Sequence, residues 1–455
     1  MSHEPVSTKI GLAELVGALS HALDITEGQP AGHGVRCCWI GMQLGEALGY
    51  DTATLGDLYY ALLLKDVGCS SNAARICQLY LADDLSFKSD FKQVDHALPQ
   101  ILRFVLSHTG LKAGLAERFR SILNIAINGG AISREMIETR CTRGAEIARQ
   151  MRFSDAVAGA ILDLDEHWNG GGQPLGKAGN DISPLAQLAL LAQVVDVFFM
   201  SSGPEAAMRE IERRAGSWFD PELSALFLAI ARDEQFWATL AAPDLDQWVI
   251  ALEPQKRSIL VDDDYLDEIA GAFAKVVDAK SPYTSGHSDR VALFADMIAE
   301  QLGFSDDRRR WLKRAALLHD IGKLGVSNQI LDKPGKPDEE EWAAIKRHPA
   351  LGETILKRIG AFASLARVAG AHHERLDGKG YPRGLTETAI DLETRIVTTA
   401  DIFDALTAER PYRAAMPVSK AFAIMDADVG TAIDPQCLEA LRRGLAAVEQ
   451  VAAAA

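Results

Sequence analysis

The chain carries one sequence pattern twice, and this repeat constrains its fold more than any other feature. When the first half is moved forward by 254 positions, GHGVRCCWIGMQLGEALGY lies over GHSDRVALFADMIAEQLGF, and ALLLKDVG lies over AALLHDIG. With a shift of 208, EHWNGGGQPLG at 166–176 lies over ERLDGKGYPRG at 374–384. Matching blocks in the same order predict two copies of one domain, spanning 1–250 and 257–455, with a linker within about 240–262.

The spacing of apolar residues is mostly helical. One stripe, which ends before a glycine, consists of Val291, Phe294, Ile298 and Leu302. Asp338 followed by EEEWAAIKRH predicts a further helix with a capped and acidic first turn. Runs that alternate apolar and polar residues are scarce. We therefore predict an all-α fold made of tandem helical bundles.

Composition restricts the classes of function. The 455 residues are 48% hydrophobic and 24% charged, as in folded soluble proteins, and the formal net charge is −16. This charge argues against binding to duplex nucleic acid. The first residues lack the features of a signal peptide, and the apolar run PLAQLALLAQVVDVFFM is interrupted by Gln187, Gln193 and Asp196. We expect a buried helix there, no membrane span and a cytoplasmic protein.

The second copy holds a set of histidines and aspartates suited to transition metals. The set is His287, His319, Asp320, His348, His372, His373 and Asp401. One such histidine alone is usually an ordinary core or surface residue, but seven candidate ligands in order favour a metal site. Asp320, after the predicted helix RWLKRAALL, can bridge two cations, and we expect His348 on the helix that begins at EEEW. Five imidazoles with two carboxylates favour iron, manganese, cobalt or zinc over magnesium or calcium, and we expect iron or manganese.

These residues occur within motifs that resemble a known family. SPYTSGHSDRV, LLHDIGKLGV, ILDKPGK, HHERLDGKGYP and ADIFDALTAERPYR are similar to the HD-GYP group of HD-domain phosphohydrolases, over about residues 265–440. The resemblance implies tandem HD-domain-like bundles, the second of them a phosphodiesterase that hydrolyses cyclic di-GMP to linear pGpG, GMP or both.

The same resemblance implies the roles of individual residues. The seven histidines and aspartates would bind metal, and Asp320 and Lys323 would act in catalysis. Lys323 would contact the scissile phosphate, and further substrate contacts would come from Tyr381, Arg410 and Arg413.

Three positions depart from the pattern of the group. Tyr283 stands where some members have a glutamate for a third metal, so we expect two divalent ions. Ser327-Asn328 replaces Pro-Asp, and Leu376 replaces an aromatic residue. None of these changes removes an expected metal ligand.

The first copy lacks most of the expected ligands. The repeat places the seven positions at His33, Lys65, Asp66, Arg140, Leu164, Asp165 and Asp196, with Cys69 at the position of Lys323 and Gln173 at that of Tyr381. Lysine and arginine would put fixed cations where metals would sit, so we expect a metal-free and inactive copy. We expect it to be a regulatory or dimerisation module. The alternative is a sensor in which Lys65 and Arg140 hold an anion.

Two other functions stay open. The second copy could hydrolyse another cyclic dinucleotide, such as cyclic GMP-AMP, because metals and Lys323 recognise phosphate rather than base. It could instead be a non-catalytic adaptor that binds diguanylate cyclases through the Gly380-Tyr381-Pro382 surface. A homodimer is also compatible with the sequence.

Overall fold

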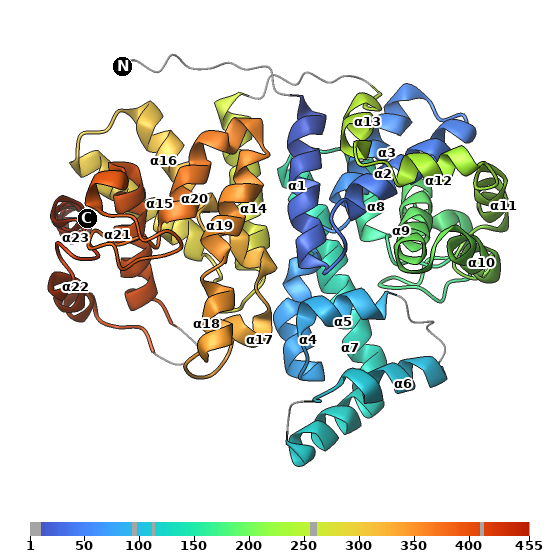
Figure 1. Ribbon diagram of the computed structural model, residues 1–455, viewed down its shortest axis with the longest axis horizontal. Coiled ribbons are helices and arrows are strands. Elements are labelled where there is room, and N and C mark those ends of the chain that lie inside the picture. Colours follow the sequence, from blue (N-terminus) through green and yellow to red (C-terminus); the bar gives the residue numbers. More distant parts are fainter. Residues whose placement is uncertain (1–10, 93–97, 112–113, 255–261, 410–413, 455) are drawn as a thin grey trace. The chain divides into compact units, whose positions relative to one another are not determined.

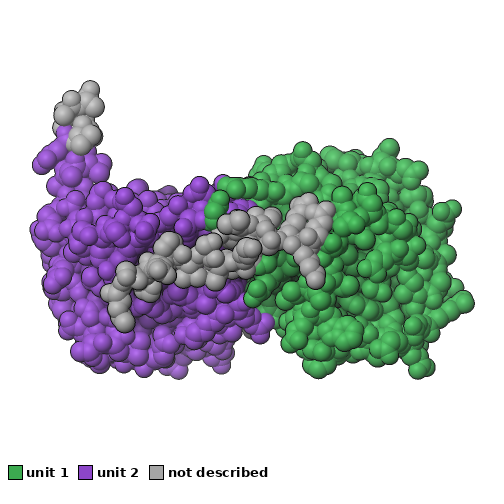
Figure 2. All heavy atoms as spheres, turned by 90° about the horizontal axis from the view of Figure 1, so that it is seen from above, with its two compact units in different colours: residues 1–262 green, residues 263–455 purple. Residues whose placement is uncertain are grey.

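The computed structural model of the chain describes residues 11–92, 98–111, 114–254, 262–409 and 414–454 (Figure 1). The chain divides into two compact units, residues 1–262 and 263–455, which Figure 2 shows in separate colours. The described residues form helices and no strand, which confirms the predicted all-α class. The boundary between the units falls at the end of the predicted linker range.

Unit 1 contains thirteen α-helices and two short 3₁₀ helices within its described residues. They are α1 (Leu12–Thr26), α2 (His33–Ala47), α3 (Thr52–Leu64), η1 (Cys69–Asn72), α4 (Ala73–Tyr80), α5 (Asp84–Phe91), α6 (Leu98–His108), α7 (Leu115–Gln150), α8 (Asp155–Leu162), η2 (Gly179–Asp181), α9 (Pro184–Ser202), α10 (Pro204–Arg214), α11 (Pro221–Ile230), α12 (Glu234–Leu240) and α13 (Leu245–Ala251). Helix α2 packs against α3 and α9 in the core of this unit, and the long α7 packs against α8 (Figure 1).

Helix α9 is the apolar segment for which we expect a buried helix. By length and composition alone it could cross a membrane, but 67% of its most apolar window is buried inside the structure. The helix packs on α2, α8 and α10. The expected core helix is therefore present.

Unit 2 contains ten α-helices and three 3₁₀ helices within its described residues. They are α14 (Asp263–Asp278), α15 (His287–Gln301), α16 (Asp306–Leu318), η3 (Ile321–Gly325), α17 (Asn328–Leu331), α18 (Glu339–Ile345), α19 (His348–Lys357), η4 (Gly360–Leu365), α20 (Ala366–Ala371), η5 (Glu387–Ala389), α21 (Leu392–Thr407), α22 (Val418–Ala427) and α23 (Pro435–Ala454). Helix α15 packs against α16, α21 and α23. Its predicted apolar stripe faces this core, since Val291 and Ile298 are fully buried.

The helix predicted after Asp338 is present as α18, and it begins with a capping box. The Asp338 carboxylate accepts from the Glu341 amide, and the Glu341 side chain accepts from the Asp338 amide. However, α18 ends at Ile345, and His348 is the first residue of the next helix, α19. The expectation that His348 lies on the EEEW helix is therefore wrong. Pro349 explains the new start, because proline is well accommodated in the first turn of a helix.

Each unit contains an equivalent close backbone contact, and in unit 2 this contact fixes the position of the candidate site. A Cβ atom at Gly322 in η3 would lie 1.9 Å from the carbonyl oxygen of His348 and 2.6 Å from the amide nitrogen of Gly352. In unit 1, a Cβ atom at Gly68 would lie 2.0 Å from the carbonyl oxygen of Arg140. Only glycine allows this approach, which sets His348 next to the Asp320 turn.

Gly322→Ala should destabilise unit 2, because the new methyl group meets backbone atoms that cannot move aside. Overpacking of this kind costs about 1–3 kcal/mol, so the unfolding temperature of unit 2 should fall by several degrees. Gly360→Ala is the control, since a Cβ atom there meets nothing within 4 Å. Equal thermal unfolding of the two variants, measured by circular dichroism, would contradict this account of η3.

Candidate metal centre

The structure brings all seven expected metal ligands of unit 2 together. They form two groups, and within each group the ligand atoms lie within 4.8 Å of one another. One group is Asp320, His348, His372 and His373, and the other is His287, His319 and Asp401. His287 and His348 are the first residues of α15 and α19. His319 and His372 directly follow the ends of α16 and α20, and Asp401 lies within α21.

Four of the histidines are oriented by hydrogen bonds from Nδ1. His319, His348 and His372 are 2.6–2.8 Å from the carbonyl oxygens of Ala316, Ile345 and Ala369. His287 Nδ1 is 2.7 Å from Asp404 Oδ2. An Nδ1 that faces an acceptor must carry the proton, so a neutral ring presents the lone pair of Nε2 to the interior. This is the form in which imidazole binds a metal.

Asp320 lies between the two groups and presents one oxygen to each. Its Oδ2 is 3.4 Å from Nε2 of both His287 and His319. Its Oδ1 is 3.2 Å from Nε2 of His348 and 3.6 Å from that of His372. Asp320 is therefore placed as the sequence predicts for a carboxylate shared by two cations.

Burial and charge keep Asp320 ionised. Burial would raise its pKa, but Lys323 and the facing histidines lower the pKa well below its usual value. Burial lowers the pKa of His372 to about 4, so that ring is neutral near neutral pH. Burial also lowers the pKa of His287, but the carboxylates of Asp320, Asp404 and Asp401 outweigh this effect and raise it to about 9. His372 thus presents a neutral imidazole to the ionised Asp320 carboxylate.

Unsatisfied polar atoms test whether the site fits a metal. Nε2 of His287, Nε2 of His319 and Asp320 Oδ1 are buried and have no hydrogen-bond partner among the described residues. Buried polar atoms without a partner are rare and costly, and three of them converge here. The nitrogen-rich donor set suits first-row transition metals. The residues present therefore fit divalent metal ions.

The remaining site residues are only partly within the described chain. Lys323 lies in η3, and its ammonium group pairs with Asp320 Oδ2. The Tyr381 ring lies 4.9 Å from the His373 ring, between centroids, so the Gly-Tyr-Pro loop borders the metal centre. Arg410 and Arg413 lie outside the described residues.

Two residues that contribute to this site were missed in the sequence analysis. Asp404 accepts hydrogen bonds from both His287 and Arg290, and so fixes the ring of His287. Trp342 of α18 packs its ring against Tyr381, with 5.9 Å between centroids. The spacing of Asp401 and Asp404, three residues apart in DIFD, is a signal that could have identified the second carboxylate, whereas Trp342 has no such sequence signal.

In unit 1, a lysine occupies the position of the metal centre. Lys65 Nζ pairs with Asp66, lies 2.9 Å from His33 Nε2, and donates to Gln193 Oε1 at 3.2 Å. Burial would lower the pKa of Lys65, but Asp66 outweighs this effect and raises it. Burial and Lys65 lower the pKa of His33 to about 4, so His33 Nε2 accepts from the ammonium group. Lys65 thus supplies the positive charge next to Asp66.

The structure also corrects one position of the repeat. Asp196 accepts from His33 Nδ1 at 2.6 Å and from Arg36, as Asp404 accepts from His287 Nδ1 and Arg290. Asp196 is therefore the counterpart of Asp404, not of Asp401 as the sequence comparison assumed. A shift of 208 places Gln193 at the position of Asp401, so unit 1 keeps only His33 and Asp66 among the seven ligand types.

Two smaller groups of metal-capable side chains occur in unit 1, but cations already contact their carboxylates. The first is His33, Cys37 and Asp196, and the second is Glu27, Asp66 and Cys69. Arg36 pairs with Asp196. Lys88 and Lys92 lie 3.2 and 2.9 Å from the Glu27 carboxylate oxygens. The expectation of a metal-free unit 1 stays a prediction, and these ion pairs support it.

Comparison with known proteins agrees with this description. The HD domain family pattern matches residues 95–223 and 272–437, once in each unit, which confirms the predicted duplication. The chain is 54% identical over 434 residues to 3'3'-cGAMP-specific phosphodiesterase 3 of Vibrio cholerae, and the match covers 95% of this chain and 94% of that protein.

Two further matches cover different shares of the chain. The chain is 35% identical over 279 residues to the cyclic di-GMP phosphodiesterase response regulator RpfG of Xanthomonas campestris, covering 59% of this chain and 66% of that protein. Among solved structures, a cyclic GMP-AMP specific phosphodiesterase of V. cholerae is 49% identical, with a TM-score of 0.65. That match covers 96% of this chain and 97% of the other.

Metal content should depend on Asp320 and not on its counterpart in unit 1. After loading with manganese or ferrous iron and desalting, elemental analysis of the full chain should find about two ions per chain. Asp320→Asn should lose most of them, because an amide cannot supply two anionic oxygens. Asp66→Asn, the matched change in unit 1, should retain them. Equal metal loss in both variants would contradict the assignment of the centre to unit 2.

Asp404→Ala should weaken metal binding without removing a ligand, because His287 loses the acceptor that fixes its ring. Partners of this kind typically contribute 10–100-fold to metal affinity. Asp296→Ala is a suitable control, since Asp296 is a buried aspartate on α15 that pairs with Arg309 and Lys313. Competition with a fluorescent chelator would measure the affinities, and unchanged affinity in Asp404→Ala would rule out a positioning role.

Proposed function

The chain belongs to the HD domain family, and on this premise we propose that it is a metal-dependent phosphodiesterase that hydrolyses a cyclic dinucleotide. The observation that carries the proposal is Asp320, a buried carboxylate with one oxygen facing each of two histidine groups. We assign the activity to unit 2, because that unit combines this carboxylate with five imidazoles.

We propose that the seven residues around Asp320 hold two divalent ions, manganese or iron. Such ions lower the pKa of a water molecule and neutralise the charge that builds on a phosphodiester. Asp320 would bridge the two sites, while His287, His319 and Asp401 complete one and His348, His372 and His373 the other. Asp404 would keep His287 oriented for binding.

The other side chains at the site act on the substrate in this proposal. Lys323 would place its ammonium group on the phosphodiester, where it offsets negative charge. Tyr381 would pack against a base or ribose next to His373. Arg410 and Arg413 of ERPYR would bind phosphate or guanine edges through their guanidinium groups.

We propose 3'3'-cGAMP as the preferred substrate. The relative of that specificity matches nearly the whole chain, whereas the cyclic di-GMP phosphodiesterase RpfG matches 59% of it. Metals and Lys323 recognise the phosphodiester common to both compounds, so the preference must come from contacts with the bases. Cyclic di-GMP hydrolysis, the expectation from the sequence motifs, is the second candidate because several relatives carry that name.

Unit 1 has a different role in this proposal. We infer that it is a regulatory or dimerisation module without hydrolytic activity, because Lys65 and Arg140 replace two histidines of the centre. Contacts of the Gly-Tyr-Pro loop with diguanylate cyclases would be a secondary property of unit 2. We expect the protein to act in the cytoplasm.

Removal of metal tests the proposed function directly. The purified chain should hydrolyse 3'3'-cGAMP faster than cyclic di-GMP in the presence of manganese or ferrous iron, with products followed by chromatography. A chelator should abolish both reactions, and added metal should restore them. Hydrolysis that survives complete metal removal would contradict the mechanism, and equal turnover of the two compounds would contradict the substrate preference.

Lys323→Met should lower turnover and leave metal content unchanged, because the ammonium group is proposed to act on the phosphodiester. A loss of about 10²–10³-fold in kcat is expected for a group that stabilises developing charge. Lys313→Met is the control, since Lys313 on α16 pairs with Asp296 away from Asp320. If Lys323→Met loses metal in proportion to activity, Lys323 is a structural partner of Asp320 instead.

A further inference from the structure

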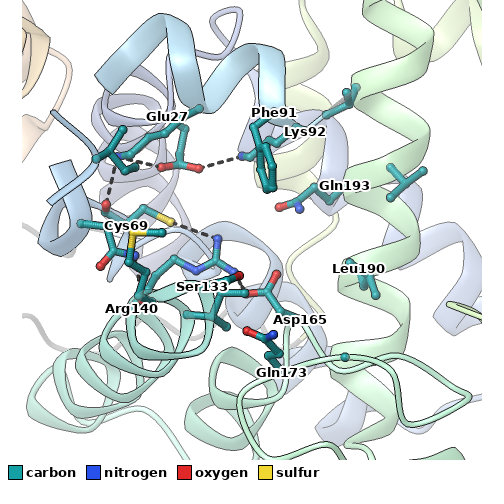
Figure 3. Close-up of a pocket in the computed structure, with 18 of the residues that line it drawn as sticks. Glu27, Cys69, Phe91, Lys92, Ser133, Arg140, Asp165, Gln173, Leu190 and Gln193 are labelled. Carbon is teal, nitrogen blue, oxygen red and sulfur yellow. Dashed lines mark hydrogen bonds and ion pairs between the residues drawn. The ribbon is translucent and has the colours of Figure 1, made fainter. Parts of the chain in front are cut away.

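Unit 1 encloses a cavity at the position that corresponds to the metal centre of unit 2. The cavity has a volume of about 210 Å³. Its wall includes Arg140, Asp165, Gln173 and Gln193, which a shift of 208 aligns with His348, His373, Tyr381 and Asp401 (Figure 3). Four positions that hold site residues in unit 2 therefore line a cavity in unit 1.

The charged residues on the wall leave the cavity positive. The wall carries three cations, Lys88, Lys92 and Arg140, and two carboxylates, those of Glu27 and Asp165. Glu27 lies between the two lysines, and Arg140 pairs with Asp165. Three cations against two carboxylates favour an anionic ligand. Asp66, His33 and Gln193 surround the Lys65 ammonium group, so Lys65 does not line the cavity. The anion contact that the sequence suggested for Lys65 is therefore not available in this cavity.

Four buried polar atoms on the wall, on Glu27, Lys92, Arg140 and Gln173, have no hydrogen-bond partner among the described residues, and two of them bear most directly on the ligand. Lys92 Nζ and Gln173 Oε1 are buried and have no hydrogen-bond partner among the described residues, although Lys92 forms an ion pair with Glu27. Burying a polar atom without a hydrogen-bond partner costs free energy, and a bound group that supplies the partner removes this cost. A matching ligand supplies an acceptor oxygen to Lys92 and an N–H or O–H donor to Gln173.

Aromatic rings line part of the wall, among aliphatic side chains such as Ile76, Leu190 and Val194, and they favour a flat group on the ligand. Phe91, Phe87 and Tyr80 line one side, and Trp218 stacks on His167 with 4.1 Å between ring centroids on another. Nucleobases stack on aromatic side chains with about 1–3 kcal/mol per base. The cavity is smaller than the ~300–1,000 Å³ of drug-sized ligand sites, which favours a ligand more compact than a complete cyclic dinucleotide.

We propose that this cavity binds a nucleoside monophosphate. The phosphate would contact Lys92 and Arg140, the base would lie between the aromatic walls, and a donor on the base or ribose would reach Gln173 Oε1. The choice of a nucleotide rests on the proposed function, because complete hydrolysis of a cyclic dinucleotide yields nucleoside monophosphates. Unit 1 would then sense the products of complete hydrolysis of a cyclic dinucleotide.

Calorimetric titration of the full chain with GMP, AMP and inorganic phosphate tests this proposal. A chelator in the buffer keeps metal out of unit 2. We expect saturable binding of GMP or AMP at about one molecule per chain, and much weaker binding of inorganic phosphate. Absence of nucleotide binding up to millimolar concentration would overturn the proposal. Phosphate that binds as tightly as both nucleotides would overturn the assignment of a base-binding wall.

Three variants locate the binding to the cavity. Gln173→Leu removes an acceptor without a partner, so it should weaken nucleotide binding about tenfold without lowering the thermal stability of the unliganded chain. Ser133→Trp, which places a large ring on the α7 wall, should abolish binding. Gln78→Leu is the control, because Gln78 is exposed on α4 and does not line the cavity. Wild-type affinity in both cavity variants would overturn the proposal.

Hydrolysis by the metal-loaded protein is measured separately. Nucleotide binding without hydrolysis of either cyclic dinucleotide would contradict the proposed function and leave the binding site in unit 1 supported. Hydrolysis without nucleotide binding would contradict only the cavity proposal.

Discussion

The charge of the buried Asp320 carboxylate is the constraint on which the candidate site depends. Burial of an ionised carboxylate costs several kcal/mol of solvation free energy unless cations or hydrogen-bond donors compensate its charge. In unit 2, Lys323 pairs with Oδ2, while two buried histidine nitrogens and Oδ1 have no hydrogen-bond partner among the described residues. Divalent cations would compensate Asp320 and satisfy these atoms together. Unit 1 meets the same constraint in another way, because Lys65 brings a covalently attached cation to Asp66.

The backbone around this carboxylate has two features in common between the units. Gly322 allows the start of α19 to approach the turn after Asp320, and Gly68 allows the interior of α7, at Arg140, to approach the turn after Asp66. The Glu374 carboxylate accepts from the amides of Arg383 and Leu385, and Glu166 accepts from the corresponding amides of Leu175 and Lys177. The loop that carries Tyr381 in unit 2 therefore has a counterpart that carries Gln173 in unit 1. Side-chain changes on a shared scaffold account for a metal centre in one unit and a cationic cavity in the other.

The sequence was sufficient to predict the fold class, the duplication and the set of residues that meet in unit 2. Histidine and aspartate are chemically distinctive metal ligands, and their order along the repeat limited which of these residues could belong to one site. The helix of His348 was assigned incorrectly, although Pro349 marked the start of a new helix. Asp196 was aligned with Asp401 because both are aspartates, whereas hydrogen bonds from His33 and Arg36 identify it as the counterpart of Asp404. The cavity of unit 1 could not be predicted, because its space depends on how Arg140, Gln173 and the aromatic side chains pack.

The positions of bound metal ions test the central claim most directly. Crystals of the full chain soaked in manganese would be measured by anomalous diffraction at the manganese absorption edge. The account predicts two anomalous peaks, one on each side of Asp320: the first next to His348, His372 and His373, and the second next to His287, His319 and Asp401. It also predicts no peak between His33 and Asp66, where the Lys65 ammonium lies. A peak at that position, or fully loaded protein with no peak in contact with Asp320, would contradict the account.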